Sequence, residues 1–108
     1  MIRPRPLVHG TLDVMILSVL AGGEQHGLGI SRELERITRG AFVVKPGSLF
    51  PALHRLESAW CVQSRWGESA NRRRAKFYKL TTRGSRRLRR EMQQWREISH
   101  AIGLLVGL

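Results

Sequence analysis

The chain has 108 residues and a formal net charge of +11, with 19 lysines and arginines against 8 acidic residues. This length supports one domain with a modest core, and such an excess of positive charge is typical of a protein with a polyanionic partner. The single cysteine excludes an intramolecular disulfide, and the four histidines show no zinc-ligand spacing, so neither a metal nor a cofactor is expected.

The chain begins with Met1–Pro6, which lacks the apolar stretch of a signal peptide, so a cytoplasmic protein is expected. Apolar residues then recur at the spacing of an amphipathic helix from Leu12 to Leu20. Thr11 is a candidate N-cap of this helix, and a start directly after Pro6 is the alternative. Gly22-Gly23 is expected to end it.

A second helix is predicted over Gly27–Thr38. Its apolar residues Ile30, Leu34 and Ile37 are expected to face inward. Gly40 is expected to terminate it, since glycine accepts the left-handed conformation that follows many helices.

The third helix opens at Lys45 with Pro46 in the first helical position. At 100° per residue one face is apolar and is expected to be buried, comprising Leu49, Leu53, Leu56 and Trp60. The opposite face carries small groups around one arginine: Gly47, Ser48, Pro51, His54, Arg55 and Ser58. Pro51 is expected to loosen or kink the N-terminal half. An ordinary solvated surface is the alternative interpretation of this outward face.

Two β-rich runs, Val62–Trp66 and Lys76–Leu80, enclose a polar loop and predict a β-hairpin. The tip of this hairpin is expected to be Arg72-Arg73-Arg74. Between Arg65 and Arg90 the sequence has eleven basic residues and one acidic residue, so the charge gathers in one region. Such a concentration indicates an interaction face.

Thr81 or Thr82 is expected to cap the last helix. Its apolar positions step by four and three residues, which is a heptad seam broken at Ser99 and formed by Leu88, Met92, Trp95, Ile102 and Val106. A monomer of this size would leave that seam exposed, so a homodimer is predicted, with Leu88, Met92, Trp95 and Ile102 at its interface. The apolar tail 101–108 is far shorter than the about 20 residues that span a bilayer, so no membrane association is expected.

Three helices, a basic hairpin and a long last helix predict a mainly α winged helix-turn-helix with a C-terminal dimerisation helix. Residues 1–81 are expected to form the DNA-binding domain and residues 82–108 the dimerisation helix. A major groove about 12 Å wide admits a helix with small outward side chains, while a basic hairpin reaches phosphates or the minor groove. The residues predicted to contact double-stranded DNA are Lys45, Ser48, Pro51, His54, Arg55, Arg72, Arg73, Arg74 and Lys76.

Several stretches resemble the PadR family of transcriptional regulators, between about Gly10 and Trp95. They are Gly10-Thr11-Leu12, His26-Gly27, Gly47-Ser48-Leu49-Phe50-Pro51-Ala52-Leu53-His54-Arg55-Leu56-Glu57 and Phe77-Tyr78-Lys79-Leu80-Thr81-Thr82-Arg83-Gly84. The third is the most specific, whereas the last is common to many winged helices. Leu28 and Phe50 stand where the family usually has tyrosine, so hydroxyl-mediated phosphate contacts are not carried over to them. Ala59-Trp60-Cys61 replaces the usual Gly-Leu turn.

The resemblance implies a homodimeric repressor of the smaller subgroup, in which a single last helix forms the dimer. A two-fold dimer of this kind reads a pseudo-palindromic operator. In some members an aromatic or drug-like ligand at the dimer interface releases the DNA, stacked on a tryptophan that Trp95 resembles. A place for Trp95 in ordinary dimer core is the alternative, and activation in place of repression stays open.

The chief rival hypothesis is a winged-helix module that binds protein or RNA partners in place of operators. The clustered arginines of the hairpin argue against protein binding alone. An enzyme is not expected, because the chain has one aspartate, no metal spacing, no phosphate-binding glycine loop and no Ser/His/Asp set. Attachment of the arginine-rich helix and apolar tail to a membrane surface is a further, disfavoured alternative.

Overall fold

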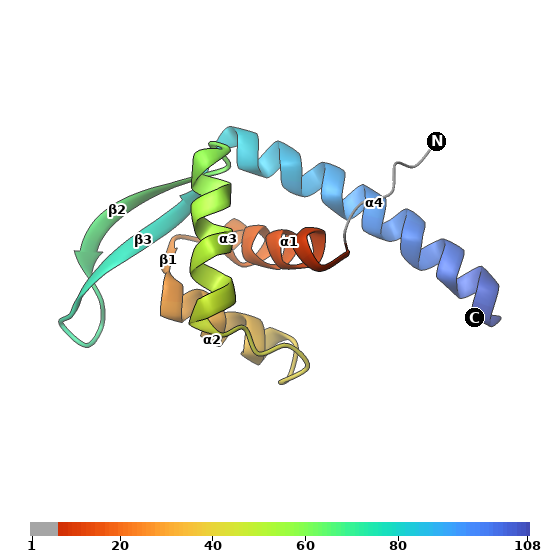
Figure 1. Cartoon of the computed structure of the whole chain (residues 1–108), viewed down its shortest axis with the longest axis horizontal. Helices are drawn as coiled ribbons and strands as arrows, with labels where there is room; N and C mark the ends of the chain where they lie inside the picture. Colours follow the sequence, from red (N-terminus) through yellow and green to blue (C-terminus); the bar gives the residue numbers. More distant parts are fainter. Residues whose placement is uncertain (1–6) are drawn as a thin grey trace.

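The computed structural model describes the backbone of residues 7–108 and the side chains from residue 11 onward. Met1–Pro6, which carry the expectation about a signal peptide, lie outside this range. The elements follow in the order α1 (Leu7–Ala21), β1 (Gln25–His26), α2 (Gly27–Ile37), α3 (Pro46–Ser58), β2 (Val62–Glu68), β3 (Arg74–Leu80) and α4 (Thr82–Val106). The predicted winged helix-turn-helix with a long last helix is confirmed (Figure 1).

Helix α1 lies at the centre of the molecule. It begins at Leu7, directly after Pro6, so the alternative start was right and the N-cap at Thr11 was wrong. Besides the expected stripe, Leu17 is fully buried and the charged Asp13 is only 5% exposed. A helix covered on several sides needs apolar residues around most of its circumference, so it has no single polar face.

Helix α2 starts at a histidine cap, because Nδ1 of His26 accepts a hydrogen bond of 3.1 Å from the backbone N–H of Gly29. Ile30 and Leu34 are buried as predicted. The inward prediction for Ile37 is wrong, since its side chain is 59% exposed. Ile37 is the last residue of the helix, and the chain continues from it into the exposed residues 39–43.

Helix α3 begins at Pro46 as predicted and continues through Pro51. Leu49, Leu53 and Leu56 are buried, but Trp60 is 73% exposed, so its inward prediction is wrong. The helix ends at Ser58, and Trp60 adopts a left-handed φ of 61° in the turn. The N–H of the next residue, Cys61, reaches back to the carbonyl of Leu56 at 2.9 Å, which closes the turn and directs the indole outward.

Strands β2 and β3 form the predicted antiparallel hairpin, longer by two residues on each side of the loop than the sequence pattern indicated. The sequence analysis missed β1, whose Gln25 and His26 pair with Tyr78 and Phe77 of β3. The sheet therefore has three strands in the order β1-β3-β2. Tyr78 points into the core and is 6% exposed.

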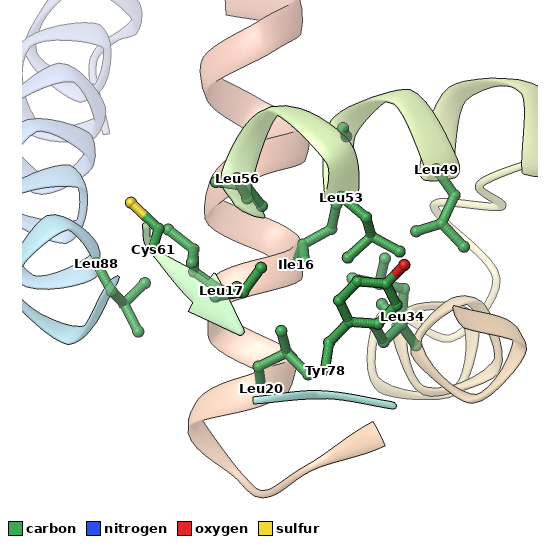
Figure 2. Packing of buried hydrophobic residues seen from close by; sticks show 13 residues of the cluster. Ile16, Leu17, Leu20, Leu34, Leu49, Leu53, Leu56, Cys61, Tyr78 and Leu88 are labelled. Atoms are coloured by element: carbon green, nitrogen blue, oxygen red, sulfur yellow. The ribbon is translucent and has the colours of Figure 1, made fainter. Parts of the chain in front are cut away.

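The start of helix α4 belongs to the core. Thr81 caps it, with Oγ1 accepting from the N–H of Gly84 at 3.0 Å. A Cβ added at Gly84 would lie 1.9 Å from the carbonyl oxygen of Cys61, so glycine allows the helix to approach this backbone. Figure 2 shows Leu88 directed at the cluster that includes Cys61 and Leu17, and Cys61 itself is buried.

The second half of α4 extends beyond the other helices, whereas the hairpin extends from the opposite end (Figure 1). The molecule is accordingly elongated, with principal dimensions of 50 × 29 × 23 Å. Among the described residues, no helix is both long enough and apolar enough to cross a bilayer.

Candidate nucleic-acid interface

The outward face of α3 is exposed and has little bulk. Lys45, Ser48, Pro51 and His54 all lie on the surface. Lys45 is the N-cap residue, and its side chain makes no capping hydrogen bond. Pro46 has no N–H, and the N–H groups of Ser48 and Leu49 donate to the Lys45 carbonyl, so the N–H of Gly47 is the one left at this end of the helix among the described residues. This end carries the positive pole of the helix dipole, which together with the Lys45 ammonium favours a nearby anion.

Arg55 lies at one edge of this face and points outward less fully than the sequence analysis predicted. Its side chain is 43% exposed, and Nη2 lies 3.5 Å from Oδ1 of Asp13 on α1. The sequence analysis missed this partner because a single aspartate within an apolar helix gives no pairing signal. Arg55 therefore has a competing acceptor within its own subunit.

Phe50 lies at the opposite edge of the face and is 49% exposed. Its ring lies against the start of α2, where a Cβ on Gly27 would come within 2.8 Å of the ring. Gly27 therefore lets α3 approach the N-terminus of α2.

The hairpin loop carries two of the three predicted arginines. Arg72 and Arg73 lie in the turn between β2 and β3, and Arg72 has a left-handed φ of 58°. Arg74 was predicted at the hairpin tip but belongs to strand β3. Its guanidinium lies 4.4 Å from the ring centroid of Trp66. Arg72, Arg73 and Arg74 are all exposed, but this cation–π contact holds Arg74 along the hairpin.

Lys76 is tied to α3. Its Nζ lies 3.4 Å from Oε1 of Glu57, and the Ser64 hydroxyl donates to the other carboxylate oxygen. The hydrogen bond from Ser64, followed by the positive charge of Lys76, lowers the pKa of Glu57. Lys76 is thus half-buried and partly neutralised, in contrast to the free cation that the sequence pattern suggested.

A groove of about 530 Å³ separates the hairpin from the start of α2 and from Phe50. Its basic residues are Arg32, Arg73, Arg74 and Lys76, and none of the described residues that line it is acidic. The sequence analysis missed Arg32, which lies on the mixed-charge face of α2. Only the pairing of β1 with β3 brings this helix next to the hairpin, and no local pattern encodes that pairing.

The arginines of α4 divide into two groups. Arg83, Arg86, Arg89 and Arg90 line a shallow surface depression, exposed as expected. Arg87 does not belong with them, because it turns inward and donates to Oδ2 of Asp13 at 2.7 Å. Arg65 is also paired, with its Nε 3.0 Å from Oε2 of Glu24.

The predicted dimer seam is only partly exposed. Leu88 is 8% exposed and belongs to the core of its own subunit, so its placement on an open seam is wrong. Trp95 is half-buried, whereas Met92 and Ile102 are exposed. The last turns of α4 expose further large apolar side chains: Leu104, Leu105, Val106 and Leu108.

Comparison with known proteins agrees with this geometry. Residues 16–90 match the model of the PadR-like family of transcriptional regulators. An uncharacterized protein of Lysinibacillus sphaericus is 26% identical over 100 residues, which cover 93% of this chain and 92% of that protein. The transcriptional regulator YqjI of Escherichia coli is 28% identical over 93% of this chain but only 46% of its own length, so this chain matches about half of it.

A solved transcriptional regulator from Clostridium thermocellum has a similar structure. Its TM-score is 0.83 at 28% sequence identity, and the match covers 93% of this chain and 97% of the regulator. The coverage includes the last helix as well as the hairpin. The similarity therefore extends over the whole architecture and is not limited to the helix-turn-helix.

Proposed function

The chain belongs to the PadR-like family of DNA-binding transcriptional regulators, and we propose that it represses transcription in the cytoplasm as a homodimer bound to a pseudo-palindromic operator. Members of this family are regulators and not enzymes. One observation carries the proposal: Phe50 of α3 and the hairpin residues Arg73, Arg74 and Lys76 line one groove, whose described lining includes four basic residues and no acidic residue. The exposed small-residue face of α3 lies next to Phe50 on the same helix. This arrangement fits two neighbouring contacts with DNA, one by α3 in the major groove and one by the hairpin to phosphates or the minor groove.

In this arrangement α3 enters the major groove. Ser48, Pro51 and His54 face the base edges, and the small side chains of Ser48 and Pro51 let the helix approach closely. Lys45 and the uncapped N-terminus of α3 contact a phosphate at the rim. Arg55 is the residue on this helix that can make a bidentate contact with guanine.

The hairpin lies beside α3 and supplies most of the affinity. Arg72 and Arg73 reach phosphates or the adjacent minor groove from the exposed turn. The sugar-phosphate backbone that separates the two DNA grooves then runs along the protein groove, near Arg32 and Lys76. Contacts of this kind position the protein without reading sequence.

Residues 82–108 are proposed to form the dimer, with α4 packing on its copy in the partner. Met92, Trp95 and Ile102 remain the interface residues of this proposal, extended by Leu105 and Val106 of the exposed C-terminal half. So many exposed apolar side chains on a projecting helix favour burial against a second copy. Leu88 contributes indirectly, by fixing the helix to its own core.

An aromatic effector is proposed to act at this interface through Trp95. The half-buried indole follows the buried residues of α4, of which Leu88 and Glu91 are the last two. A flat ligand inserted there would change the angle between subunits and so the separation of the two α3 helices. Indole fluorescence that responds to such a compound in the intact protein, but not in Trp95→Ala, supports this role; release of DNA from Trp95→Ala by the same compound contradicts it.

Footprinting on duplexes selected from a random pool tests the proposed function. Two protected major-groove patches are expected on one face of the DNA, about 10–10.5 bp apart or a multiple of that. A single patch contradicts the dimeric reading, and tighter binding of structured RNA than of selected duplex supports the rival interaction module. A reporter placed behind the selected site should lose expression when the protein is present, whereas a gain would indicate activation.

A further inference from the structure

One buried carboxylate on α1 lies between arginines of two other helices. Oδ2 of Asp13 accepts a hydrogen bond of 2.7 Å from Arg87 on α4, and Oδ1 lies 3.5 Å from Arg55 on α3. Arg87 also approaches Oε1 of Glu91 at 3.8 Å and the sulfur of Cys61 at 3.9 Å. Because burying an unpaired carboxylate is costly, Asp13 retains at least one of the two guanidinium groups.

The two arginines are held unequally. Arg87 is 25% exposed, and although burial acts to lower its pKa, the Cys61 sulfur and the Asp13 charge more than offset this, so that the pKa is raised. Arg55 is 43% exposed and meets Asp13 at a distance too long for a strong hydrogen bond. Arg87 is therefore the permanent partner of Asp13, whereas Arg55 is a partner that can be exchanged.

Arg55 is also the only lysine or arginine within α3, Pro46–Ser58. It lies beside the exposed row of Ser48 and Pro51, within reach of a duplex bound on that face. Its guanidinium has two alternatives, the carboxylate of its own subunit or an acceptor on DNA. Any DNA contact made by Arg55 must outcompete Asp13.

We propose that Asp13 is a positioning residue that makes Arg55 selective. Resting on the proposed role of α3 in reading DNA, Asp13 retains the guanidinium against a single phosphate and yields it only to a guanine edge. Both a guanine edge, through O6 and N7, and a phosphate can accept the planar fork of arginine in a bidentate manner. The guanine contact is made inside the major groove, whereas a phosphate at the helix edge stays exposed and is screened by salt, which weakens that contact. On random DNA, therefore, Arg55 stays on Asp13.

Salt dependence of binding distinguishes these two states of Arg55. Each phosphate contact adds about −0.9 to the slope of log K against log salt. Asp13→Asn should steepen the slope on random duplex by about 0.9 per subunit, about 1.8 for the dimer, as each released Arg55 takes a phosphate. The selected duplex gains less, so the ratio of selected to random affinity should fall several-fold. In the double variant Asp13→Asn/Arg55→Ala, the additional slope should disappear.

Glu35→Gln is the matched control, because it removes one negative charge from an exposed position on α2. It should leave the ratio of selected to random affinity unchanged, which separates a general gain of positive charge from release of Arg55. If Asp13→Asn weakens folding, the single variant Arg55→Ala, in which Asp13 is unchanged, tests the proposal instead. It should lower affinity for the selected duplex by about tenfold or more while the slope on random duplex stays the same.

Two outcomes overturn the proposal. One is a slope on random duplex that becomes shallower by about 0.9 per subunit, about 1.8 for the dimer, in Arg55→Ala, since Arg55 would then already contact phosphate. The other is a folded Asp13→Asn protein whose slope and affinity ratio match those of Glu35→Gln. Neither result touches the proposed function, which fails separately if selection from a random pool yields no preferred duplex.

Discussion

The guanidinium of Arg74 lies over the indole of Trp66, 4.4 Å from the ring centroid, on the face of the hairpin that borders the groove. All three arginines are exposed, but Arg74 is held by this contact, whereas Arg72 and Arg73 lie in the adjoining turn. The three arginines, consecutive in sequence, thus differ in conformational freedom. An arginine that is already ordered loses less entropy when it binds a phosphate.

Replacing Arg72, Arg73 and Arg74 by alanine should weaken binding to selected and random duplex alike, because phosphate contacts carry no sequence information. The log–log salt slope of the dimer, expected at roughly −5 to −9, should become shallower by about 0.9 for each phosphate that the variant no longer binds. Fluorescence anisotropy titrations at several salt concentrations measure both quantities. If this variant no longer prefers the selected duplex over random duplex, the hairpin and not α3 alone reads the sequence.

Ile102→Glu should convert the dimer to a folded monomer, since it places a charge in the proposed interface. Gln93→Glu, which adds the same charge at another exposed position of α4, should stay dimeric. Sedimentation at micromolar concentration measures the association, and far-UV circular dichroism checks that the helices persist. A truncation after Arg90 should likewise be monomeric and bind the selected duplex weakly; an unchanged dimer in either case argues for another interface.

Trp60→Gly should leave the protein at least as stable, with a gain of up to about 1 kcal/mol. Trp60 has a left-handed φ of 61°, which glycine adopts without strain, and its indole is largely exposed and buries little apolar surface. Thermal unfolding monitored by circular dichroism measures the change. The matched substitution Ala59→Gly, at a φ of −87°, relieves no strain and should only lower the melting temperature.

Glu57 should make stability depend on pH in the acid range. Its pKa is lowered in the folded protein, first by the Ser64 hydroxyl and then by Lys76, relative to an ordinary value of 4.5. The stabilisation is therefore fully present above pH 4.5 and is lost as pH falls through the lower folded pKa.

Denaturant unfolding of wild type and Glu57→Gln should differ most near neutral pH, and the difference should shrink below about pH 4.5. Ser64→Ala should cost about 0.5–1.5 kcal/mol at neutral pH. Glu35→Gln serves as control, because its side chain is exposed on α2 and should change stability little at any pH. A difference for Glu57→Gln that grows on acidification would contradict the assigned interactions.

The parts of the fold that the sequence predicted are those encoded by local patterns. The apolar spacing of α3 identified Leu49, Leu53 and Leu56, and the threonine before α4 identified its cap. Trp60 was misplaced because the helical period was extended beyond a turn that is closed without the usual glycine. Ile37 was misplaced for a similar reason, at the open end of α2.

The candidate site was less predictable, because its charges pair over long separations. Asp13 meets Arg55 across 42 residues and Arg87 across 74, so neither helical spacing nor charge patterning reveals the contact. Strand β1 was not predicted, because two residues are too few to show an alternating pattern. Sequence patterns thus identified where the arginines are numerous, and tertiary contacts determine which of them remain free to bind DNA.

The two residues of β1 have a mechanical consequence. Gln25 and His26 attach β3 to the chain segment that leads directly into α2, and they do so at the middle of β3, opposite Tyr78 and Phe77. This pairing supports the inner half of the hairpin, and the turn that carries Arg72 and Arg73 lies beyond it. We expect bending to concentrate in this outer part, so that the proposed minor-groove contact can adapt to groove width while α3 keeps its position.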